Sequence, residues 1–268
     1  MRAVKRVGIV GLGPIGRAVA EAIDLGLQGY RLSAVASGHA ERAAAYSRTL
    51  RRPVPVLDGP DIGAVSDIVV ECAPSAIFES LARPTLEQGR DLIVLSSGAL
   101  LTHWDLVELA DLTGGTLRVP TGALLGLDAV QAAAQNGLRS VRMTTRKPLH
   151  SLLDAPHLHG RSGLATITEP TLLFTGTARE AAEGFPANLN VAVALSLAGL
   201  GPDRTEVEIW ADPALQRNTH RIDVDAASAT FSMSIENVPS ENPKTGRITA
   251  LSVVALLRKL AAPLQIGT

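Results

Sequence analysis

The sequence predicts an α/β protein: a doubly wound parallel sheet, followed by a second α+β domain that is built on a mostly antiparallel sheet. Three observations predict this fold class. Apolar runs alternate with helical patterns through residues 1–120, as in consecutive β-α-β units. A glycine-rich turn joins the first apolar run to the first helical pattern. After about residue 140, β-branched and aromatic residues gather in strand-like runs that few helices separate.

The first predicted strand, residues 6–10, runs directly into a GxGxxG turn that opens a helix over 14–25. The first glycine of such a turn allows the tight bend, the second lets a pyrophosphate approach the backbone, and the third lets the helix pack closely on its strand. The helix start adds free N–H groups and a partial positive charge for the phosphates. We therefore predict a Rossmann-type dinucleotide site at Gly11, Gly13, Pro14, Ile15 and Gly16.

The rest of the first half repeats the alternation of strand and helix. Strands are expected at 31–36, 67–71, 91–96 and 116–119, and helices at 39–48, 75–88 and 102–112. Ligands of such sheets bind outside the carboxyl ends of the strands. Ala73 and Gly98, which follow two of those ends, are therefore expected to line the cofactor site.

The end of the second predicted strand bears on which nucleotide binds. Chains that bind NAD usually place Asp or Glu about 20 residues beyond the glycines, where it holds the ribose 2′-OH. Here that place is taken by Ala36-Ser37-Gly38, with His39 and Arg42 nearby. Because no carboxylate repels a 2′-phosphate, the cofactor is expected to be NAD or NADP, with Ser37 in contact. Arg42 is equally compatible with a solvated position on the next helix.

The second half is expected to form the other sheet. Strands are predicted at about 141–145, 171–175, 205–211, 220–224 and 229–235, and helices at 178–184 and 188–200. The final helix, 248–262, is expected to pack back on the first domain. These patterns predict a dinucleotide-binding domain over 1–120 and a second domain over 121–247.

Composition limits the class of protein. The chain has 268 residues, 46% of them hydrophobic, and a formal charge of −1. It has no basic excess for nucleic acid and no apolar run long enough for a membrane span. A single cysteine, Cys72, is consistent with a reducing cytoplasm. His157 and His159 alternate in a loop without further ordered ligands, so no metal site is expected.

Several motifs of the second half occur together in order and spacing that resemble the L-aspartate dehydrogenase family over nearly the whole chain. They are Gly122-Ala123, Gly126-Leu127-Asp128-Ala129, Arg146-Lys147-Pro148, Gly176 to Ala181, Asn188 to Ala192, Leu195 to Gly201, Asp212-Pro213, Asn218-Thr219-His220 and Asn242 to Thr245. The resemblance implies NAD(P)-dependent oxidation of L-aspartate to iminosuccinate, which water converts to oxaloacetate and ammonia, or the reverse reductive amination. It also implies a homodimer, with residues 121–247 as the substrate, catalytic and dimerisation domain. His220 would be the active-site histidine, and Ala123 and Asn190 would contact the nicotinamide.

The chemistry adds further candidates. Histidine suits proton transfer near neutral pH, which favours His220 as the acid/base group. The two carboxylates of aspartate need cationic partners in a desolvated cleft, for which the candidates are Arg146, Lys147 and Lys244. A solvated strand end and a loop lysine are the structural alternatives for these residues. Asn188 is expected to be the N-cap of its helix.

Two other functions fit the same sequence features. One is reduction of another imino acid by the same pair of domains, and the other is a noncatalytic protein that senses the nucleotide. The physiological direction of the reaction and the pathway that it serves stay open at this level.

Overall fold

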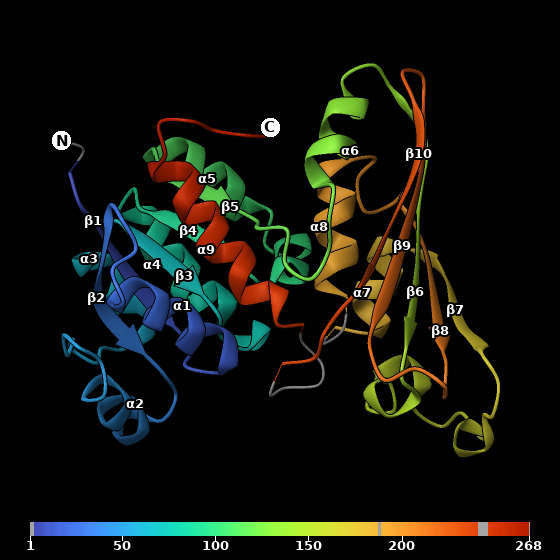
Figure 1. Ribbon diagram of the computed structural model, residues 1–268, viewed down its shortest axis with the longest axis horizontal. Coiled ribbons are helices and arrows are strands. Elements are labelled where there is room, and N and C mark those ends of the chain that lie inside the picture. Colours follow the sequence, from blue (N-terminus) through green and yellow to red (C-terminus); the bar gives the residue numbers. More distant parts are fainter. Residues whose placement is uncertain (1–2, 187–188, 241–245, 268) are drawn as a thin grey trace. The chain divides into compact units, whose positions relative to one another are not determined.

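The computed structural model describes residues 3–186, 189–240 and 246–267, and it divides into two compact units (Figure 1). Unit 1 comprises the chain up to Pro120 together with Ala250–Ile266. Unit 2 comprises Thr121–Thr249 and Gly267. Each unit is built on its own sheet, one fully parallel and one mixed, and the predicted fold class is confirmed.

Unit 1 is a five-stranded sheet in the order β2-β1-β3-β4-β5, and all of its neighbouring strands are parallel. The strands are β1 (Lys5–Val10), β2 (Tyr30–Ala36), β3 (Ile68–Glu71), β4 (Asp91–Val94) and β5 (Thr116–Arg118). The connecting helices are α1 (Pro14–Asp24), α2 (Ala40–Ser47), α3 (Ile62–Val65), α4 (Phe78–Glu87) and α5 (Asp105–Thr113).

The core of unit 1 explains why its strands are apolar throughout. Helices cover both faces of a parallel sheet, so successive side chains of a central strand are all buried, as in β3. The last helix, α9 (Ile248–Ala261), closes this core, and Figure 1 shows it beside α1. Its residues Val253 and Leu257 belong to the same buried cluster as Val19 and Ile23 of α1.

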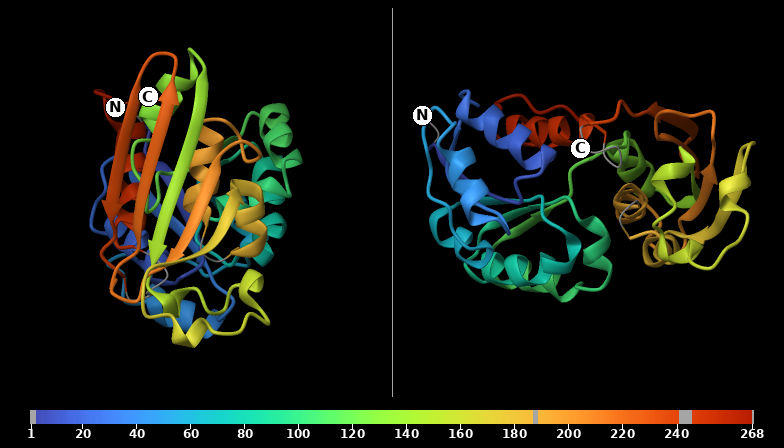
Figure 2. Two further views of the ribbon diagram at one scale, coloured as in Figure 1. Left: turned by 90° about the vertical axis from the view of Figure 1, so that its right-hand side faces the viewer. Right: turned by 90° about the horizontal axis from the view of Figure 1, so that it is seen from below.

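Unit 2 is a second five-stranded sheet in the order β10-β9-β6-β8-β7, with its strands side by side in Figure 2 (left). Its strands are β6 (Leu138–Lys147), β7 (Thr171–Thr177), β8 (Glu206–Ala211), β9 (Thr219–Ala226) and β10 (Thr230–Glu236). Only the pairing of β6 with β8 is parallel, and the others are antiparallel. Its helices are α6 (Leu127–Ala134), α7 (Ala178–Gly184) and α8 (Asn190–Ala198).

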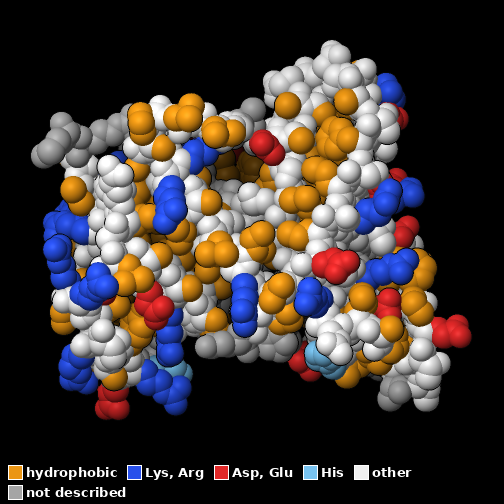
Figure 3. Space-filling view, in the orientation of Figure 1, with side chains coloured by type: hydrophobic (Ala, Val, Ile, Leu, Met, Phe, Trp, Pro, Cys, Tyr) orange, Lys and Arg blue, Asp and Glu red, His pale blue; other side chains and the backbone are white. Residues whose placement is uncertain are grey.

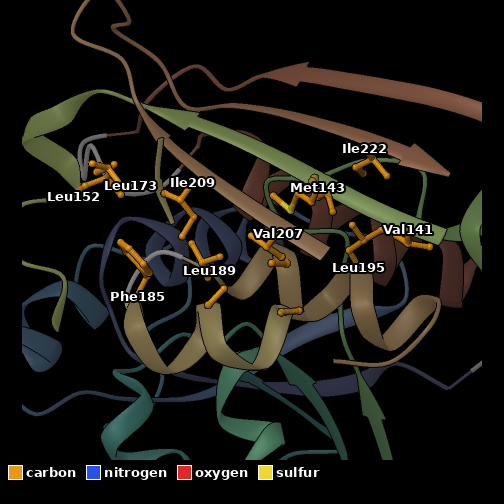
Figure 4. Close-up of a cluster of buried hydrophobic side chains, with 14 of the residues drawn as sticks. Val141, Met143, Leu152, Leu173, Phe185, Leu189, Leu195, Val207, Ile209 and Ile222 are labelled. Carbon is orange, nitrogen blue, oxygen red and sulfur yellow. The ribbon is translucent and has the colours of Figure 1, made fainter. Parts of the chain in front are cut away.

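Helices cover one face of the unit 2 sheet, and the side chains alternate accordingly. Val141, Met143 and Ile222 lie on the side of the sheet that faces Leu195 of the helices, and Phe185 lies at the far end of the same cluster (Figure 4). The residues between them carry charges on the other face, where Arg142 pairs with Glu206 and Arg221 pairs with Asp223. The two faces therefore differ in chemistry from one residue to the next along each strand.

The structure differs from the sequence-based element boundaries in a few places. Helix α6 was not predicted, although its Ala-rich sequence has good helix propensity. Residues Ser75–Ile77 form a 3-10 turn, so α4 begins only at Phe78. Strand β6 begins at Leu138, three residues before its predicted start, because an irregularity in its register lets Leu138 pair with Ala226.

Candidate active site

The glycine turn of unit 1 has the geometry that a dinucleotide requires. Gly11 has φ +95°, a left-handed conformation that other residues rarely adopt. A Cβ on Gly16 would overlap the carbonyl oxygen of Gly11, so α1 can approach its strand only through glycine. A Cβ on Gly13, by contrast, would have no atom within 4 Å. The open space at Gly13 lies at the N-terminus of α1, which has no side-chain cap, so the turn fits a bound pyrophosphate.

A buried carboxylate holds together the strand ends beside this turn. Glu71, the last residue of β3, has no exposed surface, yet its carboxylate accepts four hydrogen bonds. The backbone N–H of Ala73 and the hydroxyl of Ser96 donate to Oε1, at 2.9 and 3.0 Å. The backbone N–H groups of Leu95 and Ser96 donate to Oε2, at 3.0 and 2.8 Å. Burial raises the pKa of Glu71, and the hydrogen bonds oppose that shift.

The nucleotide side of unit 1 is basic around α2. Ser37 follows β2, and its hydroxyl oxygen accepts a long 3.4 Å hydrogen bond from the backbone N–H of His39. Arg42 is exposed on α2, and Figure 3 shows Lys and Arg side chains gathering around this helix at the lower left. This surface offers positive charge and no carboxylate at the end of β2, which is compatible with either nucleotide.

In unit 2, polar side chains continue the covered face of the sheet beyond its apolar core. Thr145 of β6 lies opposite His220 of β9, which in turn lies opposite Ile235 of β10. The same antiparallel register, extended by one pair, places Lys147 opposite Asn218 and Asn218 opposite Asn237. The backbone hydrogen bond from Asn237 N to Asn218 O, at 2.8 Å, continues that register. We call Lys147, Asn218 and Asn237 the polar row.

Burial decides the charge state of the groups at this end of the sheet. His220 is 3% exposed, and burial, assisted by the charge of Lys147, lowers its pKa to about 3. Lys147 is 2% exposed, and burial lowers its pKa to about 8. At neutral pH the site therefore holds a neutral imidazole close to a lysine that is mostly protonated.

A hydroxyl fixes the histidine ring. Thr145 is fully buried, and its Oγ1 lies 2.8 Å from Nδ1 of His220, in hydrogen-bond contact. This contact occupies Nδ1 and leaves Nε2 as the ring nitrogen for a ligand. A neutral imidazole held in one orientation can accept a proton, although a pKa of about 3 makes His220 a weak base until a ligand changes its surroundings.

Two amide oxygens of the polar row are buried without a hydrogen-bond partner among the residues that the structure describes, those of Asn218 and Asn237. Asn237 is 3% exposed, and its Nδ2 donates to the carbonyl oxygen of Ala123 at 2.9 Å. That hydrogen bond settles which end of the amide is the oxygen. A buried acceptor without a partner costs about 1–3 kcal/mol, which a ligand with N–H or O–H groups would relieve.

The remaining predicted site residues do not all lie near His220. Arg146 is exposed on the opposite face of the sheet from Lys147, with its guanidinium 5.5 Å from the centre of the Trp210 ring. It therefore does not share a site with His220. Asn190 is the first residue of α8, and Leu189 occupies the N-cap position. Lys244 and Asn188 lie outside the described residues.

Sequence reasoning assigned no role to Glu71, Thr145, Asn218 or Asn237. Glu71 could have been found, because an acidic residue that ends an apolar buried strand needs a specific reason to be there. Asn218 and Asn237 become neighbours only through the pairing of β9 with β10, which the sequence alone does not specify.

Within residues 3–186, 189–240 and 246–267, no three His, Cys, Asp or Glu side chains are grouped so as to hold a metal ion. His157 instead packs against Phe174 and Phe185, with ring centres 5.3 Å away in both cases. None of the described helices is long and apolar enough to cross a membrane.

Two family models match this chain. Residues 128–260 match the model described as "Aspartate dehydrogenase, C-terminal", and residues 11–120 match "Homoserine dehydrogenase, NAD binding domain". The first spans the polar row and His220, and the second begins at Gly11 and so includes the whole glycine turn. Together the two models account for both units.

Individual relatives give the same result over the whole length. The L-aspartate dehydrogenase of Bradyrhizobium diazoefficiens is 57% identical over 264 residues, which cover 98% of this chain and 94% of the relative. L-aspartate dehydrogenase 3 of Bordetella bronchiseptica is 52% identical, over 98% of this chain and 97% of the relative. The crystal structure of aspartate dehydrogenase from Thermotoga maritima superposes with a TM-score of 0.76 at 24% identity, covering 98% and 99% of the two chains. That last likeness shows the fold.

Proposed function

The chain belongs to the L-aspartate dehydrogenase family, and from that premise we propose that it interconverts L-aspartate and iminosuccinate with NAD or NADP. The observation that carries this proposal for the chain itself is the pairing of a buried neutral His220 with a buried Lys147 on one face of the unit 2 sheet. One group suits proton transfer and the other suits a carboxylate.

The cofactor is held by backbone atoms of unit 1. Gly11, Gly13 and Gly16, with Pro14 and Ile15, would receive the pyrophosphate, and Ser37 would lie near the adenosine ribose. Ala73 and Gly98 stand on the loops that Glu71 fixes, and Ala123 and Asn190 would contact the nicotinamide. When bound, the nicotinamide supplies the acceptor for the hydride that leaves the substrate.

Lys147 would bind a substrate carboxylate. A buried ammonium gains most from a partner that is desolvated with it, and L-aspartate brings two carboxylates. Formation of this ion pair offsets the positive charge that, together with burial, lowers the pKa of His220. Substrate binding thereby makes His220 a stronger base.

His220 would then accept a proton from the amino group through Nε2, while Thr145 holds Nδ1. As the hydride leaves Cα, the nitrogen lone pair forms the C=N bond of iminosuccinate. Iminosuccinate then reacts with water in a separate hydrolysis, which gives oxaloacetate and ammonia. In the reverse direction the same histidine returns the proton.

The direct test is an initial-rate assay with L-aspartate and either NAD⁺ or NADP⁺, followed by the absorbance of the reduced nicotinamide. Turnover is expected with at least one nucleotide, and oxaloacetate with ammonia should drive the reverse reaction. Turnover only with cyclic imino acids would favour a reductase of another imino acid. Tight cofactor binding with no turnover in either direction would favour a nucleotide-sensing protein.

The family resemblance also leads us to propose a homodimer in the cytoplasm. The single cysteine is consistent with that compartment. Burial raises the pKa of the Cys72 thiol well above its usual value, which keeps it protonated and unreactive. Sedimentation equilibrium tests the dimer, since a mass of one chain at all concentrations would contradict it.

A further inference from the structure

The unpartnered oxygens of Asn218 and Asn237 identify what kind of group the polar row receives. Both lie on the covered face of the sheet, two residues along the strands from the level of Thr145 and His220. The Asn237 amide cannot turn to relieve its oxygen without losing its hydrogen bond to Ala123. Both oxygens are buried acceptors, and Asn218 and Asn237 are 9% and 3% exposed as whole residues.

An acceptor pair excludes some ligand groups and requires others. A carboxylate would be repelled, because it too carries only acceptor atoms at neutral pH. Lys147, at the other end of the row, carries a positive charge and prefers an anionic group. A ligand that lies along the row therefore needs an anionic group at Lys147 and an N–H donor at the two asparagines.

We propose that Asn218 and Asn237 bind the α-amino nitrogen of the substrate and so select an amino acid over a hydroxy or keto acid. This inference rests on the proposed function and adds the recognition of nitrogen to it. After His220 has taken one proton and the hydride has left, the product nitrogen is planar with two N–H bonds in its protonated form. Two acceptor oxygens match those two N–H groups.

The same two oxygens would disfavour binding of the 2-hydroxy and 2-keto acids that correspond to aspartate. The hydroxyl of a 2-hydroxy acid has one proton and would leave one asparagine oxygen facing lone pairs. The carbonyl oxygen of oxaloacetate has none and would face both acceptors unfavourably. Sites built to hydrogen-bond an N–H group reject analogues that lack it, because the buried partners are then left unpaired.

Gly246 lies against the Asn237 amide oxygen, so a substitution there can displace that oxygen. A Cβ on Gly246 would lie 2.8 Å from Oδ1 of Asn237 and 3.1 Å from its Cγ, and the backbone there does not have a positive φ. Gly246→Ala should therefore displace the Asn237 side chain while leaving its chemistry unchanged.

The experiment compares two ligands that differ only in the presence of the α-amino group. L-Aspartate and succinate carry the same two carboxylates, and succinate lacks the amine. Binding of each is measured by calorimetry with NADH or NADPH present, so that no turnover occurs. The variants are Asn218→Leu, Asn237→Leu and Gly246→Ala, with Asn218→Asp to restore an acceptor. The control is Asn136→Ala, which alters an exposed asparagine of unit 2.

Each leucine variant and Gly246→Ala should weaken L-aspartate about 10- to 100-fold and leave succinate within about twofold. Asn218→Asp should recover most of the loss, and Asn136→Ala should change neither ligand. Equal weakening of both ligands would overturn the proposal, because the asparagines would then only support the fold of the site. Unchanged affinity for both would also overturn it, since an ordered water would then satisfy the oxygens. Absence of L-aspartate turnover in the unaltered protein, with succinate and L-aspartate bound equally, would reject the proposed function instead.

Discussion

Unit 1 and unit 2 each have a region suited to a ligand. In unit 1 it is the glycine turn with the neighbouring loops at Ala73 and Ser96, which we call the rim, and in unit 2 it is the polar row. The rim uses backbone: a turn of three glycines, a helix start, and two loops that Glu71 ties together. The polar row uses side chains that three neighbouring strands bring onto one face.

This difference sets what each region tolerates. The rim requires glycines, because an added Cβ would block the turn. The polar row requires particular polar side chains. The glycine turn of the rim is also local in sequence, within Gly11–Gly16, whereas Lys147 of the row is 71 and 90 positions from Asn218 and Asn237. We expect substitutions in unit 2 to affect turnover and substrate affinity, and substitutions in unit 1 to affect cofactor affinity.

The largest effect is expected from His220→Ala. Removal of the proton acceptor should lower kcat about 10²- to 10⁴-fold, the usual contribution of a positioned acid/base group. Cofactor affinity, measured by fluorescence quenching on titration with NADH, should stay within about twofold. Activity close to that of the unaltered protein would mean that another group takes the proton.

Lys147→Met should raise the KM for L-aspartate and lower kcat/KM about 100-fold, because a substrate carboxylate loses its buried cationic partner. In the unaltered protein, kcat/KM should fall as the pH rises through about 8, where Lys147 loses its proton. Lys147→Arg should remove that decline, since arginine stays protonated. Arg146→Ala, one residue away on the opposite face, is the matched control and should leave the KM within about twofold.

The two glycines of the turn should separate cofactor binding from folding. Gly13→Ala should weaken the cofactor about 10-fold, because the added methyl group occupies the space that the pyrophosphate approaches. Its cost in stability should be at most about 1 kcal/mol, since φ is −72° and no atom lies within 4 Å of the new Cβ. Gly16→Ala should cost about 3 kcal/mol or more, because its Cβ overlaps the backbone of Gly11. Denaturant titration of both variants makes the comparison, and equal stability losses would contradict it.

The smallest effect on turnover is expected from Glu71→Gln. An amide cannot accept all four hydrogen bonds, so at least one buried donor loses its partner, at a cost of about 1–3 kcal/mol. The loops at Ala73 and Ser96 should loosen, and the KM for the cofactor should rise severalfold while kcat changes little. A lower kcat at an unchanged cofactor KM would indicate that these loops position the substrate.

Most of the fold could be predicted from the sequence because it is encoded locally. Alternating apolar runs and helical patterns predict β1 through β5 to within one or two residues, and the capping box of Thr177 and Glu180 marks the start of α7. The short helix α3 and helix α6 were missed because neither has a clear start signal or a long repeat.

The site was predictable to different degrees in the two units. The glycine motif identifies the rim because its spacing carries the whole geometry. Lys147 and Arg146, adjacent in sequence, were both candidates, with Lys147 favoured, and the strand places them on opposite faces of the sheet. The Asn237 side chain could not be assigned, since nothing near it in sequence indicates that β10 lies beside β9.

The return of α9 to unit 1 has a consequence for how the protein can be made. The chain leaves unit 1 after Pro120 and re-enters it at Ala250, so unit 2 is an insertion within the nucleotide unit. During synthesis on a ribosome, Val19 and Ile23 lack their packing partners Val253 and Leu257 until all of unit 2 has been made. A fragment that stops at residue 120 would expose that surface and aggregate, whereas a fusion of residues 3–120 to residues 250–266 through a flexible linker would bury it.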